Sequence, residues 1–91
     1  MNMNFVITHY FIKDNITEAM MSPHVAYLKE LFDKGILIIT GPFTDEKRGG
    51  MFIVEVKDED ELDNVVNNDP AILSGLAGYE VRPYKIVFQR K

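Results

Sequence analysis

A helix begins, on sequence grounds, at Ser22-Pro23-His24-Val25-Ala26-Tyr27-Leu28. Serine is a preferred N-cap residue and proline is tolerated at the first helical position, so Ser22 and Pro23 are the clearest start signal. Thr17 is an alternative cap for a helix that begins before Pro23. Gly35 stands where a helix C-cap belongs. We therefore predict a helix from Ser22 to Gly35, with Thr17 as the alternative start.

The inner side of this helix carries a histidine. Apolar residues recur at spacings of three and four, at Val25, Leu28, Leu31 and Phe32. His24 shares a helix face with Leu28 and Leu31. A helix N-terminus disfavours imidazolium, which keeps a ring in the first turn neutral and able to accept a proton near pH 7. A nearby carboxylate acts in the opposite direction and sets the tautomer. His24 is thus a candidate general base or, alternatively, a structural residue bonded to backbone.

Four segments are predicted to be strands, and the first is Phe5-Val6-Ile7-Thr8-His9-Tyr10-Phe11-Ile12. Both of its faces are largely apolar, which favours a central strand that is covered on both sides. The other strands are a short buried run at 36–40, then 51–56 and 80–88. Gly41-Pro42 ends the second strand, and the polar residues 44–50 form a hairpin loop. Pro83 implies that the last strand lies at an edge or contains a bulge.

A second helix is predicted over residues 58–67, with Leu62, Val65 and Val66 on its inner side. Asp69 is expected to cap a further short helical turn that begins at Pro70. The resulting order, β-α-β-β-α-β, indicates an α+β, ferredoxin-like antiparallel sheet with helices on one face. We expect one domain over residues 1–91.

The face of such a sheet away from the helices also carries apolar residues here. A protomer must cover this face, and packing of two identical sheets face to face is the simplest solution. A modest core in a chain of 91 residues would also gain from an oligomer. The pattern therefore predicts a homodimer.

Composition excludes several classes of function. The net charge is −4 and the ten basic residues are scattered, so binding to nucleic acid is not expected. Cysteine is absent, which excludes disulfides and thiolate chemistry. No apolar run is long enough to span a bilayer, and no signal-peptide pattern opens the chain, so we expect a cytoplasmic protein without a membrane partner. No metal is expected, because HExxH or comparable ligand spacing is missing.

Two other polar residues lie in suggestive positions. Asp69 is explained by capping its own short helix, although the carboxylate would also suit a neighbouring histidine. His9 is placed among apolar side chains by strand alternation, as a core or pocket histidine. Residue spacing does not establish that either of them meets His24.

The chain resembles the YciI-like family of small proteins. The resemblance rests on Pro23-His24-Val25-Ala26-Tyr27-Leu28, Asp33-Lys34-Gly35, Thr40-Gly41-Pro42-Phe43, Asn68-Asp69-Pro70 and Val81-Arg82-Pro83-Tyr84, and it covers essentially the whole chain. It implies a ferredoxin-like fold that forms a dimeric α+β barrel. It also implies that His24 and Asp69 are the catalytic pair.

The family resemblance implies a small enzyme without a cofactor, of lyase or isomerase type. Asp69 would orient His24, and His24 would remove a proton from a small, cyclic or aromatic metabolite. Substrate contacts are expected from His9, Ser22, Gly41, Pro42 and Pro70. The alternative is a non-catalytic module of the same dimeric fold that binds a small molecule.

Overall fold

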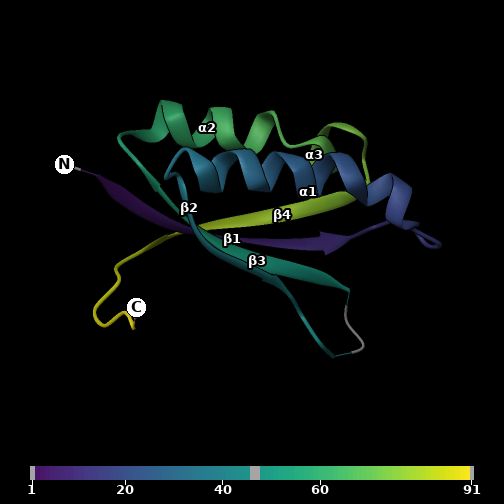
Figure 1. Ribbon diagram of the computed structural model, residues 1–91, viewed down its shortest axis with the longest axis horizontal. Coiled ribbons are helices and arrows are strands. Elements are labelled where there is room, and N and C mark those ends of the chain that lie inside the picture. The colour runs from purple at the N-terminus through teal and green to yellow at the C-terminus, as the bar shows by residue number, and fades with distance from the viewer. Residues whose placement is uncertain (1, 46–47, 91) are drawn as a thin grey trace.

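The strands and helices follow one another in the predicted order. The computed structural model describes residues 2–45 and 48–90. In chain order the elements are β1 (Met3–Phe11), α1 (Glu18–Asp33), β2 (Leu37–Pro42), β3 (Gly49–Val56), α2 (Glu59–Asn67), α3 (Pro70–Leu73) and β4 (Ala77–Tyr84). Figure 1 shows the three helices on one side of a twisted sheet. The α+β, ferredoxin-like prediction is confirmed.

The four strands form an antiparallel sheet in the order β2-β3-β1-β4. The central position of β1 is confirmed, and so is the edge position of the strand that contains Pro83. The prediction of a buried second strand is wrong, because β2 lies at the other edge. Only Leu37 of β2 is buried under the helices, and a register shift after it turns Ile39 to the open side, where it is 56% exposed.

The core lies between the sheet and the helices, which form two layers in Figure 1. Its buried members are Phe5, Ile7, Leu31, Leu37, Phe52, Val54, Val56, Leu62, Val65 and Val66. The inward face of α2 is thereby confirmed. We predicted that both faces of β1 are covered. Within the single chain, the helices cover only one of these faces.

The first helix begins earlier than Ser22. Thr17 is the N-cap, and its Oγ1 accepts a hydrogen bond from the backbone N–H of Met20 at 3.2 Å. The prediction of Ser22 as the cap is wrong, because the good helix formers before it extend the helix upstream and Pro23 lies in the interior. His24 is therefore about two turns from the start. Since the helix dipole acts mainly on the first turn, the expected influence of the helix N-terminus on His24 is also wrong.

The inner stripe of α1 is narrower than predicted. His24 and Leu31 are buried and Leu28 is partly buried, whereas Val25 and Phe32 are exposed. The latter two each follow an inward residue by one position, which rotates them about 100° from the contact line. At the other end, Gly35 has a φ of +79° and follows the C-cap Lys34, so the glycine end signal is confirmed.

Two predicted boundaries are corrected. The last strand ends at Tyr84 and not at residue 88, because β1 offers no partner beyond the pair Asn4–Tyr84. Phe88 is consequently 95% exposed. The predicted hairpin loop is shorter at its end, since Gly49 and Gly50 already belong to β3. Its centre, residues 46–47, lies outside the described residues. Within the described residues, the helices are all too short or too polar to cross a membrane.

Candidate active site

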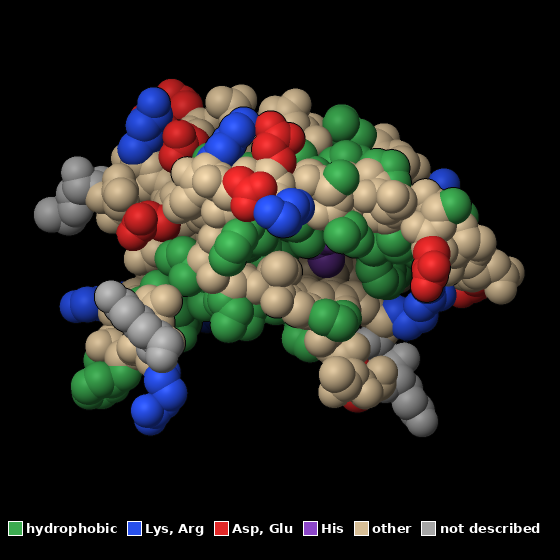
Figure 2. All heavy atoms as spheres, viewed as in Figure 1, with side chains coloured by type: hydrophobic (Ala, Val, Ile, Leu, Met, Phe, Trp, Pro, Cys, Tyr) green, Lys and Arg blue, Asp and Glu red, His purple; other side chains and the backbone are tan. Residues whose placement is uncertain are grey.

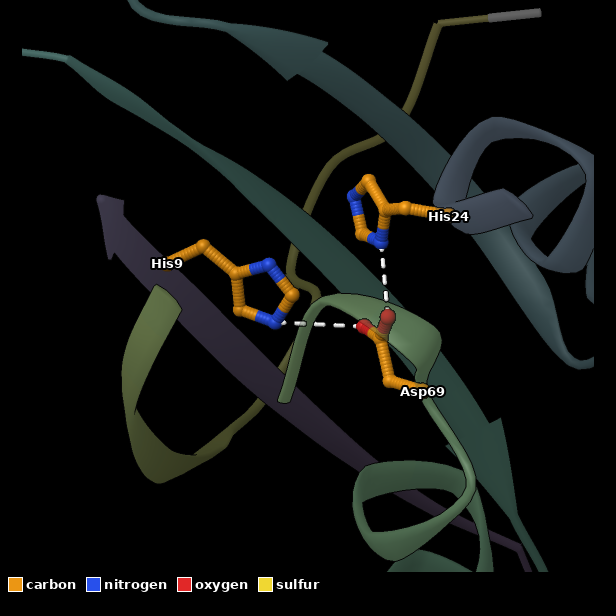
Figure 3. A group of neighbouring side chains, drawn as sticks. All are labelled: His9, His24 and Asp69. Carbon is orange, nitrogen blue, oxygen red and sulfur yellow. Dashed lines mark hydrogen bonds and ion pairs between the residues drawn. The ribbon is translucent and has the colours of Figure 1, made fainter. Parts of the chain in front are cut away.

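Three separate elements bring His24, Asp69 and His9 together beneath the helices. His24 comes from α1, Asp69 from the residue before α3, and His9 from β1. His24 Nδ1 lies 2.7 Å from Asp69 Oδ1, and His9 Nε2 lies 3.4 Å from Asp69 Oδ2. Figure 3 shows the carboxylate between the two imidazole rings. All three residues are buried.

Asp69 both caps its helix and pairs with His24. Its Oδ1 accepts a hydrogen bond from the backbone N–H of Ala71 at 2.9 Å and another from His24 Nδ1 at 2.7 Å. The choice between capping and pairing, which spacing left open, is thus not exclusive. The cap holds the carboxylate in place, so that one residue fixes the start of α3 and the orientation of the His24 ring.

The hydrogen bond determines which nitrogen of His24 is available for chemistry. An ionised carboxylate can only accept hydrogen bonds, so the Nδ1 atom that faces Asp69 carries the hydrogen. In the neutral ring, Nε2 then keeps its lone pair. Figure 3 shows Nε2 on the side of the ring away from Asp69. His24 is thereby arranged as a proton acceptor.

His9 lies beside the pair as a neutral ring. Burial lowers the pKa of His9 below its usual value, while Asp69 raises it and His24 lowers it further. The centroid of the His9 ring lies 5.1 Å from that of His24 and 5.0 Å from that of Phe52, whose ring is nearly perpendicular to it. Asp69 Oδ2 is buried and has no hydrogen-bond partner among the described residues.

A cavity of about 440 Å³ opens beside these rings. It is lined by His9, Phe11, Met21, His24, Val25, Leu28, Thr40, Gly41, Pro42, Gly49, Gly50, Met51 and Phe52. Figure 2 shows a histidine at the bottom of a hollow with hydrophobic side chains around it. The size and the mainly apolar lining suit a small ligand that is fixed by a few polar groups.

The predicted site residues divide into two groups in space. His9, Gly41 and Pro42 line the same cavity as His24. Pro70 lines a separate surface depression together with Pro23. Ser22 is exposed and is among the lining residues of neither the cavity nor this depression. Contacts from Ser22 and Pro70 to a substrate therefore stay predictions without support from the cavity.

Two glycines that line the cavity beside His9, Gly49 and Gly50, allow a close approach of neighbouring backbone, a role that the sequence did not reveal. Gly50 pairs with His9 across the sheet and so faces the helix side. A Cβ at Gly50 would lie 2.8 Å from the carbonyl oxygen of Gly41, and one at Gly49 would collide with the carbonyl oxygen of His9. The signal in the sequence that bears on this part of the cavity was strand alternation, because it puts His9 on the sheet face that the helices cover.

Tyr27 stabilises the packing of α1, the helix that carries His24, against α2. Its hydroxyl donates a hydrogen bond to the carbonyl oxygen of Val65 at 2.8 Å, which joins α1 to α2. Burial, with the charges of Asp69 and Glu30, raises the pKa of Tyr27 to about 12. The phenol therefore stays protonated and acts as a structural donor.

Known structures with this fold include enzymes. TftG of Burkholderia phenoliruptrix AC1100, a 5-chloro-2-hydroxyhydroquinone dehydrochlorinase in complex with 2,5-dihydroxybenzoquinone, is 27% identical, with a TM-score of 0.71 over 91% of this chain and 94% of that chain. Protein YjcS is 13% identical, with a TM-score of 0.68 over 96% and 100% of the two chains. SnoaB, a cofactor-independent oxygenase from Streptomyces nogalater, is 12% identical, with a TM-score of 0.57 over 97% and 95%. The last two show a shared fold alone.

Sequence comparison identifies the family. Among curated protein sequences the chain has no significant match. The family model of the YCII-related domain, however, matches residues 3–85, which is nearly the whole chain. The chain therefore belongs to the family of YCII-related domains.

Proposed function

We propose that this protein is a small enzyme that needs no cofactor and that acts on a hydroxylated, ring-shaped metabolite as a lyase or isomerase. The observation that carries the proposal is the 2.7 Å hydrogen bond between His24 Nδ1 and Asp69 Oδ1 at the edge of an apolar cavity. A buried carboxylate in this position holds the imidazole in one tautomer and stabilises the imidazolium that forms when the ring accepts a proton.

In the proposed reaction, His24 Nε2 removes a proton from a hydroxyl or from a carbon activated by a carbonyl. The electron pair of the broken bond forms a new double bond in the substrate. In an elimination, the leaving group departs as an anion with the electron pair of its own bond. In an isomerisation, His24 returns the proton to another atom of the substrate. Asp69 stays ionised throughout and offsets the charge on His24.

The character of the cavity favours a flat, mainly apolar ring as the substrate. If His9 Nε2 carries the hydrogen that faces Asp69, its Nδ1 accepts a hydrogen bond, as does His24 Nε2. The site then offers two acceptors to a substrate with two hydroxyl groups. The dehydrochlorinase TftG, whose structure contains a dihydroxybenzoquinone, supports this class of substrate.

The test is an elimination assay with the purified chain and 5-chloro-2-hydroxyhydroquinone, under anaerobic conditions and without added cofactor. We expect release of chloride together with the absorbance of the quinone product, at a rate that is proportional to enzyme concentration. Related rings without chlorine, incubated in deuterated water, would report isomerisation through incorporation of deuterium. Saturable binding of these rings without any turnover would instead favour a non-catalytic binding module.

The proposal includes a homodimer that packs through the open face of the sheet. Strand register places Val6, Thr8, Tyr10, Ile39, Met51 and Ile53 on this face. Tyr10 and Ile39 are about half exposed in the single chain. Burying such a patch against a second copy would stabilise both protomers.

We expect sedimentation equilibrium to give a dimer for the unaltered chain. Ile53→Lys should shift it to a monomer, because two like charges would face each other near the middle of the interface. Leu73→Lys is the matched control, since Leu73 is exposed on α3 in the helix layer. If the unaltered chain sediments as a monomer at micromolar concentrations, the proposed dimer is refuted.

A further inference from the structure

We infer that His9, His24 and Asp69 form a binding site for a divalent transition-metal ion such as Zn²⁺. Each residue offers one ligand atom, and these atoms all lie within 4.8 Å of one another. Two imidazole nitrogens and one carboxylate oxygen are a donor set that Zn²⁺ uses in sites with three protein ligands and an open fourth position. Metal binding by these residues is a different activity from the proposed proton transfer, which needs no metal.

The separation of the ligand atoms is close to what a bound ion requires. In a tetrahedral site with bonds of about 2.0–2.1 Å, two ligand atoms lie roughly 3.4 Å apart. His9 Nε2 and Asp69 Oδ2 are already 3.4 Å apart. His24 Nδ1 is held at 2.7 Å from Asp69 Oδ1 by a shared hydrogen, which an ion would replace. The two imidazole nitrogens lie within 4.8 Å of each other, so they need to approach by about 1.4 Å at most.

The state of the Asp69 carboxylate is the second observation that points to an ion. Asp69 is 1% exposed, and its Oδ2 has no hydrogen-bond partner among the described residues. A buried carboxylate oxygen without a partner is costly unless it binds a cation or a donor. The other oxygen, Oδ1, keeps its hydrogen bond from the backbone N–H of Ala71, which would orient the carboxylate toward the ion.

The cavity provides room for the remaining ligand of the ion. His9 and His24 both line it, whereas Asp69 lies behind them. A water molecule or a substrate hydroxyl could therefore complete the coordination from the cavity side. Because the ion and the hydrogen bond to Asp69 use the same nitrogen of His24, metal binding and the action of His24 as a base exclude each other. Zn²⁺ is thus expected to inhibit the proposed reaction.

The experiment is a calorimetric titration of the full chain with ZnCl₂ after removal of bound metal by a chelator, without substrate. We expect one equivalent of Zn²⁺ per chain. His9→Gln, His24→Gln and Asp69→Asn should each weaken binding by at least about tenfold. Asp58→Asn is the matched control, because Asp58 is also an aspartate at an N-cap but has no histidine partner among the described residues.

A second measurement uses only the unaltered chain, so its result does not depend on how well any variant folds. Co²⁺ bound to the unaltered chain should give the visible absorption of a four- or five-coordinate site with nitrogen ligands. Binding that is unchanged in all three site variants, or no binding to the unaltered chain, would overturn the inference. Because no substrate is present, these outcomes are independent of whether the elimination assay succeeds.

Discussion

Replacement of His24 by glutamine is expected to lower kcat by about 10²- to 10⁴-fold, the usual contribution of a positioned general base. Glutamine is close in size to histidine and fills the same space on α1, but its side chain does not accept a proton near pH 7. The loss should appear in kcat more than in KM, because the proton transfer occurs in the transition state. Initial rates of the elimination reaction over a range of substrate concentrations would measure both constants.

Lys29→Gln is the control for this measurement, since Lys29 lies on the same helix but is exposed and paired with Asp33. Its rate should match that of the unaltered chain. Circular dichroism and thermal unfolding would show that the His24 variant is folded. Full activity in a folded His24→Gln chain would remove the basis for the proposed mechanism.

Replacement of Asp69 by alanine is expected to lower the free energy of unfolding by about 2–5 kcal/mol, because it leaves two buried donors without an acceptor. These donors are His24 Nδ1–H and the backbone N–H of Ala71. Asp58→Ala, which removes an exposed N-cap from α2, should cost only about 1 kcal/mol. Urea unfolding of both variants would give the comparison, and equal losses would contradict the idea that Asp69 does more than cap a helix.

Asp69→Asn separates the two tasks of this residue. Asparagine is as good an N-cap as aspartate, so most of the stability should be kept. The amide is uncharged, however, and does not stabilise an imidazolium on His24. We therefore expect a folded chain whose kcat falls by about 10² or more. A variant with normal turnover would mean that the carboxylate charge has no part in the reaction.

Local patterns in the sequence account for most of the fold. Alternation on β1 correctly placed Phe5 and Ile7 inside, and spacings of three and four correctly placed the inner residues of α2. Errors arose where two local signals competed. Ser22-Pro23 is a good helix start by itself, but Thr17 and the helix formers after it moved the start upstream. Residue types alone do not decide such a competition, because both caps are chemically suitable.

The sequence by itself determined the order of the elements and the inward faces of β1 and α2, and it pointed to His24 and Asp69 through short motifs. These features depend on neighbours within a few positions, where periodicity and capping act. Only the tertiary structure decided that one oxygen of Asp69 serves both Ala71 and His24, which lies 45 positions away, and that His9 faces the other oxygen. Distances between elements depend on how helices and sheet pack, and packing sums many weak contacts that no short stretch of sequence contains.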